Sequence, residues 1–237
     1  LLGGHSGNEI GKERANAIKI LARYLTRLPY FQLASISGGT RSNVIPSSAE
    51  AIITVADKEA ALSIAETLRC ELRNEYSSSD PDLKLTISDA AMPEMAIKRK
   101  KSMLIADSLL AVPHGVKAMD TKFPGVVETS DNLAIISIDK NRFNISISVR
   151  STIDSRKNLL CSEIQTILEA FDYKTWIASS YPAWEPDKDS AFTKRFARSY
   201  RKHIGRKPKV TVIHAGLECG IINSRIPGMQ SVSIGPE

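Results

Sequence analysis

Two neighbouring runs decide the fold class: Asn132-Leu133-Ala134-Ile135-Ile136-Ser137-Ile138 and, after the pair Lys140-Asn141, Phe143-Asn144-Ile145-Ser146-Ile147-Ser148-Val149-Arg150. Apolar and polar residues alternate in the second run, which puts Ile145, Ile147 and Val149 on one face of a strand. Two such runs joined by a short polar turn predict an antiparallel hairpin. Asp154 is then expected to cap a helix, and residues 173–179 are expected to form a closing strand.

The same order of elements is predicted earlier in the chain. Strands are expected at 31–37 and 49–56, then a helix capped by Asp57, then a strand at 83–88. The order strand, strand, helix, strand therefore occurs twice, over about 31–88 and about 132–180. Each half is expected to be a small sheet with helices on one face, which is an α+β arrangement. A further helix is expected ahead of each half, at 8–28 and at about 101–111.

The chain changes character at Tyr181-Pro182-Ala183-Trp184-Glu185-Pro186-Asp187, where two prolines indicate a linker. A helix at about 190–204 and short strands at 209–213 and 231–234 follow, with the character of an α/β domain. The segment is too short to fold as a domain by itself. We therefore predict a domain at 1–181, with similar halves at about 1–90 and 100–181, and part of an α/β domain at 187–237.

Composition narrows the possible classes of protein. The chain has 237 residues, of which 42% are hydrophobic and 24% charged, as in ordinary globular proteins. No run approaches the roughly 18 apolar residues of a membrane helix. The 3 cysteines are far apart, which disfavours a disulfide framework or thiolate zinc site and favours a reducing, cytoplasmic setting. The net charge of +6 and the run Lys98-Arg99-Lys100-Lys101 permit a nucleic-acid partner, but no aromatic residues interrupt that run, so a solvated helix start is favoured.

Both ends of the sequence predict that it is a piece of a longer protein. It begins within Leu1-Leu2-Gly3-Gly4-His5-Ser6-Gly7 without an initiator methionine, and it stops at Ile234-Gly235-Pro236-Glu237, directly after an apolar run.

Five polar residues are candidates for a functional site. Glycines on both sides of His5 leave its imidazole free to donate a hydrogen bond to an oxyanion or a carboxylate. Asn43 ends the glycine turn Gly38-Gly39-Thr40-Arg41-Ser42-Asn43, and Arg150 at a strand end can clamp a carboxylate with two hydrogen bonds. His214 and Glu218 lie in Ile213-His214-Ala215-Gly216-Leu217-Glu218-Cys219-Gly220, a strand end followed by a glycine turn. The structural alternatives are a plain turn, a hairpin connection, a surface arginine and a buried histidine.

Taken together, these motifs resemble the aminoacyl-histidine dipeptidases, also called Xaa-His dipeptidases or peptidase D. The resemblance also covers Gly125-Val126-Val127-Glu128-Thr129-Ser130 with Asn132, and it runs in order along essentially the whole chain. These enzymes belong to the di-zinc metallopeptidase family of peptidase T and carnosinase. The resemblance implies that residues 1–181 are a lid inserted into a catalytic α/β domain, to which 187–237 return.

The resemblance also implies roles for single residues. His5 matches a lid histidine that stabilises the tetrahedral oxyanion, Asn43 an asparagine that holds the substrate, and Arg150 an arginine that binds its C-terminal carboxylate. Glu218 and His214 lie in the turn that borders the substrate pocket. The zinc-binding residues and the general base of the family have no counterpart in this sequence, so the chain is expected to be inactive alone.

Two classes of function follow from the resemblance. The first is a fragment of a cytoplasmic zinc dipeptidase that hydrolyses dipeptides with metal-activated water. The second is a dimerisation module, because lids of relatives pair across subunits. A nucleic-acid or membrane partner is not expected.

Overall fold

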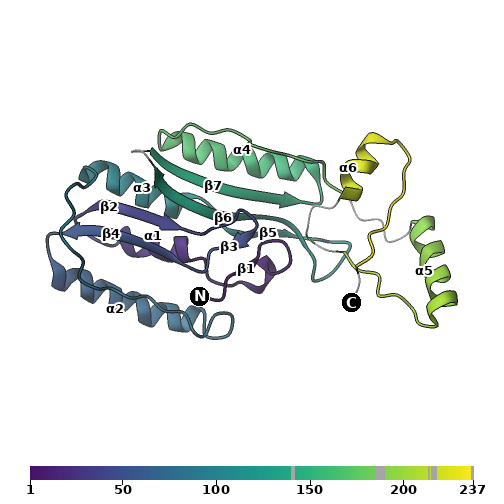
Figure 1. Ribbon diagram of the computed structural model, residues 1–237, viewed down its shortest axis with the longest axis horizontal. Helices are drawn as coiled ribbons and strands as arrows, with labels where there is room; N and C mark the ends of the chain where they lie inside the picture. The colour runs from purple at the N-terminus through teal and green to yellow at the C-terminus, as the bar shows by residue number, and fades with distance from the viewer. Residues whose placement is uncertain (140–141, 185–189, 213, 215–217, 236–237) are drawn as a thin grey trace.

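The computed structural model describes the chain except residues 140–141, 185–189, 213, 215–217 and 236–237. The expected turn at Lys140-Asn141 and part of the glycine turn after His214 therefore lie outside the described residues. A sheet and a layer of helices form the larger part of the molecule, and the C-terminal helices lie beyond one end of the sheet (Figure 1). The elements are β1 (Gly4–His5), the 3-10 helix η1 (Ile10–Lys12), α1 (Ala17–Leu25), β2 (Phe31–Gly38), β3 (Val44–Ile45), β4 (Ala49–Val55), α2 (Lys58–Glu75), α3 (Arg99–Ala111), β5 (Gly115–Met119), β6 (Val127–Asp139), β7 (Arg142–Ser151), α4 (Asp154–Ala170), α5 (Ala191–Ile204) and α6 (Glu218–Arg225).

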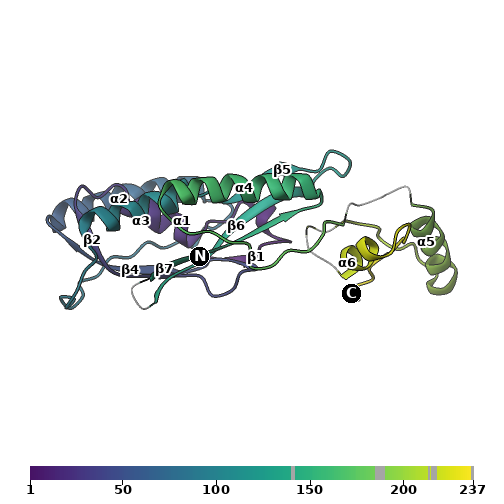
Figure 2. The ribbon, with the colours of Figure 1, turned by 90° about the horizontal axis from the view of Figure 1, so that it is seen from above.

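The main sheet is antiparallel and is built on the long strand β6. β7 pairs with β6 from Thr129↔Ser151 to Asp139↔Arg142, which confirms the predicted hairpin. On the other edge of β6, β5 pairs near its start and β2 pairs near its end, and β4 continues the sheet beyond β2. α1, α2, α3 and α4 cover one face of this sheet (Figure 2). We call the opposite face the open face. The α+β class predicted from the sequence is confirmed.

The predicted order of strand, strand and helix occurs twice, without its closing strands, and the two halves share one sheet. Helix, strand, strand, helix occurs as α1, β2, β4, α2 and again as α3, β6, β7, α4. The two hairpins join through the pairs Ser37↔Ser137 and Gly38↔Ile136, so the prediction of two separate sheets was wrong. Gly39 follows this junction with φ of +70°, and a side chain there would collide with the carbonyl oxygen of Ala134.

The predicted closing strands at 83–88 and 173–179 do not form, and this prediction was wrong. Leu83 and Leu85 still pack against the core, and the Leu85 carbonyl accepts a hydrogen bond from Arg69 Nε at 2.7 Å. Alternation of apolar residues reports which side chains are buried, whereas a strand also needs a neighbouring strand edge with free backbone groups.

The helix predicted at 8–28 is interrupted, so that prediction was wrong in its first half. η1 ends at Glu13, which has a left-handed φ of 53°. Asn16 then caps α1, because its side chain accepts hydrogen bonds from the backbone N–H of Ile18 and Lys19. Its amide group also donates to the Leu133 carbonyl at 2.9 Å, which ties the start of α1 to β6.

The other helix boundaries follow ordinary capping. Asp57 caps α2 as predicted, because its carboxylate accepts from Ala60 N at 2.9 Å. Asp154 is the first residue of α4 and not its cap, which corrects the prediction. Its carboxylate instead accepts hydrogen bonds from Lys157 Nζ and from Ala183 N in the segment after the helix.

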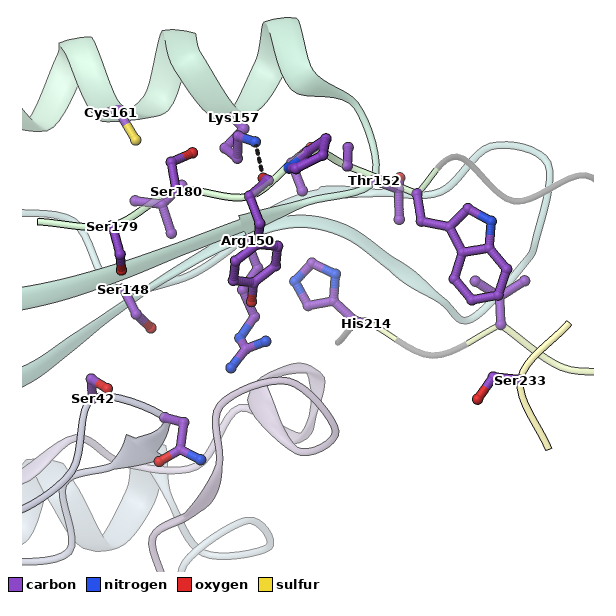
Figure 3. Close-up of a pocket in the computed structure, with 18 of the residues that line it drawn as sticks. Ser42, Ser148, Arg150, Thr152, Lys157, Cys161, Ser179, Ser180, His214 and Ser233 are labelled. Atoms are coloured by element: carbon purple, nitrogen blue, oxygen red, sulfur yellow. Dashed lines mark hydrogen bonds between the residues drawn. The ribbon is translucent and has the colours of Figure 1, made fainter. Parts of the chain in front are cut away.

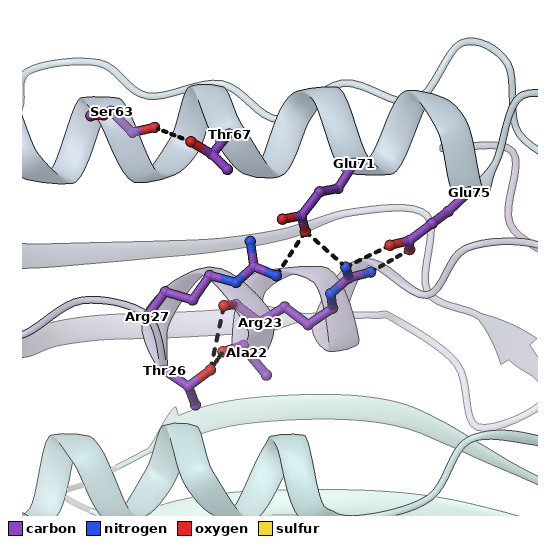
Figure 4. A network of polar contacts seen from close by, with 8 residues as sticks. All are labelled: Ala22, Arg23, Thr26, Arg27, Ser63, Thr67, Glu71 and Glu75. Atoms are coloured by element: carbon purple, nitrogen blue, oxygen red, sulfur yellow. Dashed lines mark hydrogen bonds and ion pairs between the residues drawn. The ribbon is translucent and has the colours of Figure 1, made fainter.

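One apolar core lies between the sheet and the helices. Leu33 and Ile36 from β2 and Leu133 and Ile136 from β6 are at most 2% exposed within it. Outside the core, Arg23 of α1 and Arg27, just after its C-terminal end, pair with Glu71 and Glu75 of α2 (Figure 4). The hydrogen bond from Arg23 lowers the pKa of Glu75. These exposed pairs orient α2 over α1 more than they stabilise the fold, since such pairs contribute about 0–1 kcal/mol.

The C-terminal segment has little core of its own. α5 has no buried residue, and Ile204, Val210 and Ile234 are all more than half exposed. The short strands predicted here are wrong where the structure describes the chain, because 209–212 and 231–234 form no strand. In the described residues no helix is long and apolar enough to cross a membrane.

Candidate functional site

The turn that carries His5 is held rigidly by its own backbone. His5 Nδ1 accepts hydrogen bonds from Gly7 N at 3.1 Å and from Asn8 N at 3.3 Å. Since both partners are donors, the ring proton of neutral His5 lies on Nε2. Glu9 Oε2 accepts from His5 N at 2.9 Å, and this backbone hydrogen bond lowers the pKa of Glu9. The turn therefore presents Nε2–H of His5 as a hydrogen-bond donor.

A short antiparallel pair brings the loop of Asn43 to this turn. β1 pairs with β3 through His5↔Val44, and Ser6 N donates to the Asn43 carbonyl at 2.9 Å. Asn132 on β6 holds the same loop against the sheet, because its amide donates to the Val44 carbonyl at 2.8 Å. His5 and Asn43, 38 positions apart in sequence, thus come together on the open face.

Four polar side chains from β6 and β7 lie together on the open face. Ser130 is opposite Arg150 and Asn132 is opposite Ser148 in the register of the two strands. Leu133, Ile147 and Val149 pack into the core, so the alternate residues point to the other side. We call Ser130, Asn132, Ser148 and Arg150 the polar recess. Figure 3 shows Arg150 beside Ser148 and His214, with Ser42 from the neighbouring loop close by.

Three atoms of the polar recess are buried and have no hydrogen-bond partner among the described residues: Arg150 Nε, Ser148 Oγ and Asn132 Oδ1. No carboxylate of the described residues forms an ion pair with Arg150. A half-buried guanidinium without a counter-ion is unfavourable unless an anion completes the site. The recess therefore offers donors to an anionic group and one acceptor, Asn132 Oδ1, to a neighbouring N–H.

The structure brings His214 to the edge of the recess. It is 6% exposed, and its Nε2 lies 2.7 Å from Ser130 Oγ. Burial, followed by the nearby charge of Arg150, lowers the pKa of His214 to about 4. His214 is therefore neutral at physiological pH, and it does not add positive charge beside Arg150.

A wide cleft with a volume of about 1840 Å³ opens beside these residues. Asn43, Ser148, Arg150 and His214 line it, together with α4, the 173–184 segment and the C-terminal segment. His5 does not line the cleft itself, but it lies next to Gly7, which packs against the backbone of the cleft residue His214. Glu218 is exposed at the start of α6 and does not line the cleft. The structure thus assembles four of the five candidates and leaves Glu218 apart.

Three members of the recess were not among the predicted site residues: Ser130, Asn132 and Ser148. A signal was present in the sequence, because the five consecutive polar residues Glu128-Thr129-Ser130-Asp131-Asn132 directly precede the apolar run Leu133-Ala134-Ile135-Ile136. All five are at most 4% exposed. Buried polar residues need partners, so a polar run inside a core strand indicates a site or a network.

The described residues contain no group of three or more His, Cys, Asp or Glu side chains that could hold a metal ion. A zinc centre like that of the family does not fit the donor set that this part of the chain supplies.

Comparisons with known proteins identify relatives of this chain. Residues 2–80 match the family model of the peptidase dimerisation domain. The chain is 35% identical to the cytosol non-specific dipeptidase of Escherichia coli (strain K12) over 241 residues, which cover 100% of this chain and 50% of that protein. The crystal structure of aminoacylhistidine dipeptidase from Vibrio alginolyticus matches with a TM-score of 0.86 and 30% identity, over 94% of this chain and 47% of that one. The chain spans about half the length of these relatives, and the three matches together support its assignment to a family of dipeptidases.

Proposed function

We propose that this chain is the substrate-holding lid of a dipeptidase and that the polar recess binds the C-terminal carboxylate of a dipeptide. The observation that carries the proposal is Arg150, a half-buried guanidinium with no carboxylate partner among the described residues. A guanidinium binds a carboxylate through two parallel hydrogen bonds, and the charge assistance roughly doubles their strength. Ser148 Oγ, which also lacks a partner, can donate to the same group.

The other residues of the site have complementary roles in this proposal. Asn132 holds the facing loop in place through its hydrogen bond to the Val44 carbonyl, and Asn43 orients the peptide from that loop. His5 donates its Nε2–H to the oxygen that becomes negative when the peptide carbonyl is attacked. The role of Glu218 is limited to the border of the pocket, since it lies outside the cleft.

Zinc enters the proposal through the family resemblance alone. The two ions would be held by residues other than those described here, because the described residues provide no ligand cluster. The chemistry of such ions is to activate water for attack on the peptide bond. We place the parent enzyme in the cytoplasm, and we propose no nucleic-acid partner and no membrane partner for it.

Binding can be tested with a dipeptide and its C-terminal amide. Calorimetric titration of the 237-residue chain is expected to show binding of the free dipeptide and at least tenfold weaker binding of the amide, which lacks the negative charge. Equal affinity for the two ligands would contradict the carboxylate assignment.

We also propose that the chain does not hydrolyse dipeptides by itself. The assay is release of free amino acids from a dipeptide panel with added zinc, and no release is expected. Turnover that a chelator abolishes would show that this chain holds a working metal centre.

A second candidate function is dimerisation, supported by the match of residues 2–80 to a peptidase dimerisation domain. β4 ends the described sheet on one side, so its outer backbone groups are available to a second copy. Sedimentation equilibrium of the chain is expected to give twice the monomer mass of 26.0 kDa. A monomer at all concentrations would count against this function without affecting the carboxylate assignment.

A further inference from the structure

His214 connects two parts of the molecule that are far apart in sequence. Its Nε2 lies 2.7 Å from Ser130 Oγ on the open face of β6, across 84 positions of sequence. Ser130 is 2% exposed and His214 is 6% exposed, so water does not compete for this hydrogen bond.

The backbone of His214 makes a second contact, with the turn of His5. A Cβ atom on Gly7 would overlap the carbonyl oxygen of His214 and would also lie 3.0 Å from Cε1 of His5. Only glycine allows the C-terminal segment to pass this close to the turn. Gly7 therefore separates the two histidines with the smallest residue available.

We propose that Ser130 and Gly7 are positioning residues that hold His214 at two points and thereby fix the C-terminal segment over the polar recess. The inference rests on the proposed function for its consequence, which is the affinity for a substrate carboxylate. It assigns to His214 an anchoring role in place of direct contact with the substrate.

The pair does not have the properties of a serine nucleophile with its base. Ser130 is buried, so a substrate carbonyl cannot approach its Oγ. The lowered pKa of His214 makes it a weak base at neutral pH. No carboxylate of the described residues is seen to orient its second ring nitrogen, as nucleophilic triads require.

The Ser130–His214 hydrogen bond affects Arg150 because His214 and Arg150 lie next to each other at the recess. Ser130 and Arg150 are opposite each other on β6 and β7, so the anchored imidazole covers the recess beside the guanidinium. Excluding water from this side lowers the local dielectric constant, which strengthens the attraction between Arg150 and a carboxylate.

The test uses Ser130→Ala, which removes the hydroxyl that contacts His214. Ser130→Thr keeps a hydroxyl at this position. Ser146→Ala is the control, because it removes another serine hydroxyl from the open face of the sheet, on β7. Proton NMR titration of the His214 ring without ligand measures the anchor directly. In the intact chain its pKa is expected at about 4. Ser130→Ala is expected to raise it by at least 1 unit toward the ordinary value of roughly 6.5, because the released ring gains water. Ser130→Thr and Ser146→Ala are expected to leave it in place.

Gly7→Ala provides an independent second variant and is expected to raise the same His214 pKa, since the added methyl group displaces the segment. Dipeptide affinity is expected to fall about tenfold in Ser130→Ala and Gly7→Ala and to stay unchanged in Ser146→Ala. If the pKa of His214 is unchanged in folded Ser130→Ala and Gly7→Ala, the proposal that these residues hold His214 in place is overturned. Failure of every protein to bind dipeptide, the unaltered chain included, overturns the proposed function, while the titration still decides the anchor.

Discussion

Replacing Arg150 by alanine separates binding from stability in a way that few substitutions do. Its guanidinium has no ion pair and no hydrogen-bonded partner at Nε among the described residues, so its removal breaks no described contact. It also removes a half-buried charge that is costly to desolvate. We therefore expect Arg150→Ala to unfold at the same urea concentration as the unaltered chain or at a higher one.

The same substitution is expected to weaken dipeptide binding strongly. A hydrogen bond to a charged group contributes about 1.5–3 kcal/mol, which corresponds to a loss of roughly 10- to 150-fold in affinity. Calorimetric titration at low salt measures this loss. Arg150→Lys is expected to recover only part of it, because an ammonium group cannot form the two parallel hydrogen bonds.

Arg156 provides the matched control. Its Nη1 lies 2.8 Å from Oε1 of Glu128, whose side chain is 5% exposed. Arg156→Ala leaves that carboxylate buried beside Thr129 Oγ1 alone, at an expected cost of about 1–2 kcal/mol in stability and none in affinity. Lower stability with unchanged affinity in Arg150→Ala would refute the reasoning, because it would show that Arg150 stabilises the fold and does not bind the ligand.

Three further predictions concern polar groups of α1, its N-cap and β6. Lys19→Met is expected to lower the free energy of unfolding in urea by about 1–3 kcal/mol, because Lys19 Nζ donates to the carbonyls of Leu109, Leu110 and Val112 at the end of α3; equal midpoints would contradict it. Asn16→Ala is expected to cost about 1–2 kcal/mol or more, since a helix cap and a buried hydrogen bond are lost together, and a loss of less than about 0.5 kcal/mol would exclude that role. Burial raises the pKa of Asp131 to about 7, although Lys19 opposes this, so its contribution to stability is present below pH 3.8 and is lost as the pH rises through 7. Asp131→Asn should therefore match the unaltered chain near pH 3.5 and unfold at higher urea than it at pH 8, and equal curves at pH 8 would disprove the cost of ionising Asp131.

Sequence periodicity predicted most of the regular elements. The hairpin of β6 and β7, the strands β2 and β4 and the helices α2, α3 and α4 all lie close to the predicted ranges. Each of these elements buries one apolar face, and the spacing of the apolar residues along the sequence predicts that face. The prediction of a single helix over 8–28 failed because Glu13 adopts a left-handed conformation and Asn16 caps a new helix. Both features break the backbone of the helix, but neither changes the spacing of the apolar residues from which the helix was predicted.

The candidate site was predictable only in part. The sequence singled out His5, Asn43 and Arg150 as candidates because glycine turns and strand ends are local features, and the resemblance to the dipeptidases implied their roles. The sequence did not single out Ser130 and Ser148, because the role of a serine in a strand depends on which residue lies opposite it in the sheet. The register that puts Ser130 next to Arg150 and under His214 follows from strand pairing and not from local sequence.

By itself, the sequence determined the α+β class, the repeated order of strand, strand and helix, and the resemblance to the dipeptidases, since these depend on local periodicity and on motifs that keep their order along the chain. Only the tertiary structure decided that the two halves share one sheet, that the recess lies on its open face, and that Arg150 has no counter-ion among the described residues. Pairing between distant strands and the burial of a charge depend on which groups meet in space, and no local pattern encodes that.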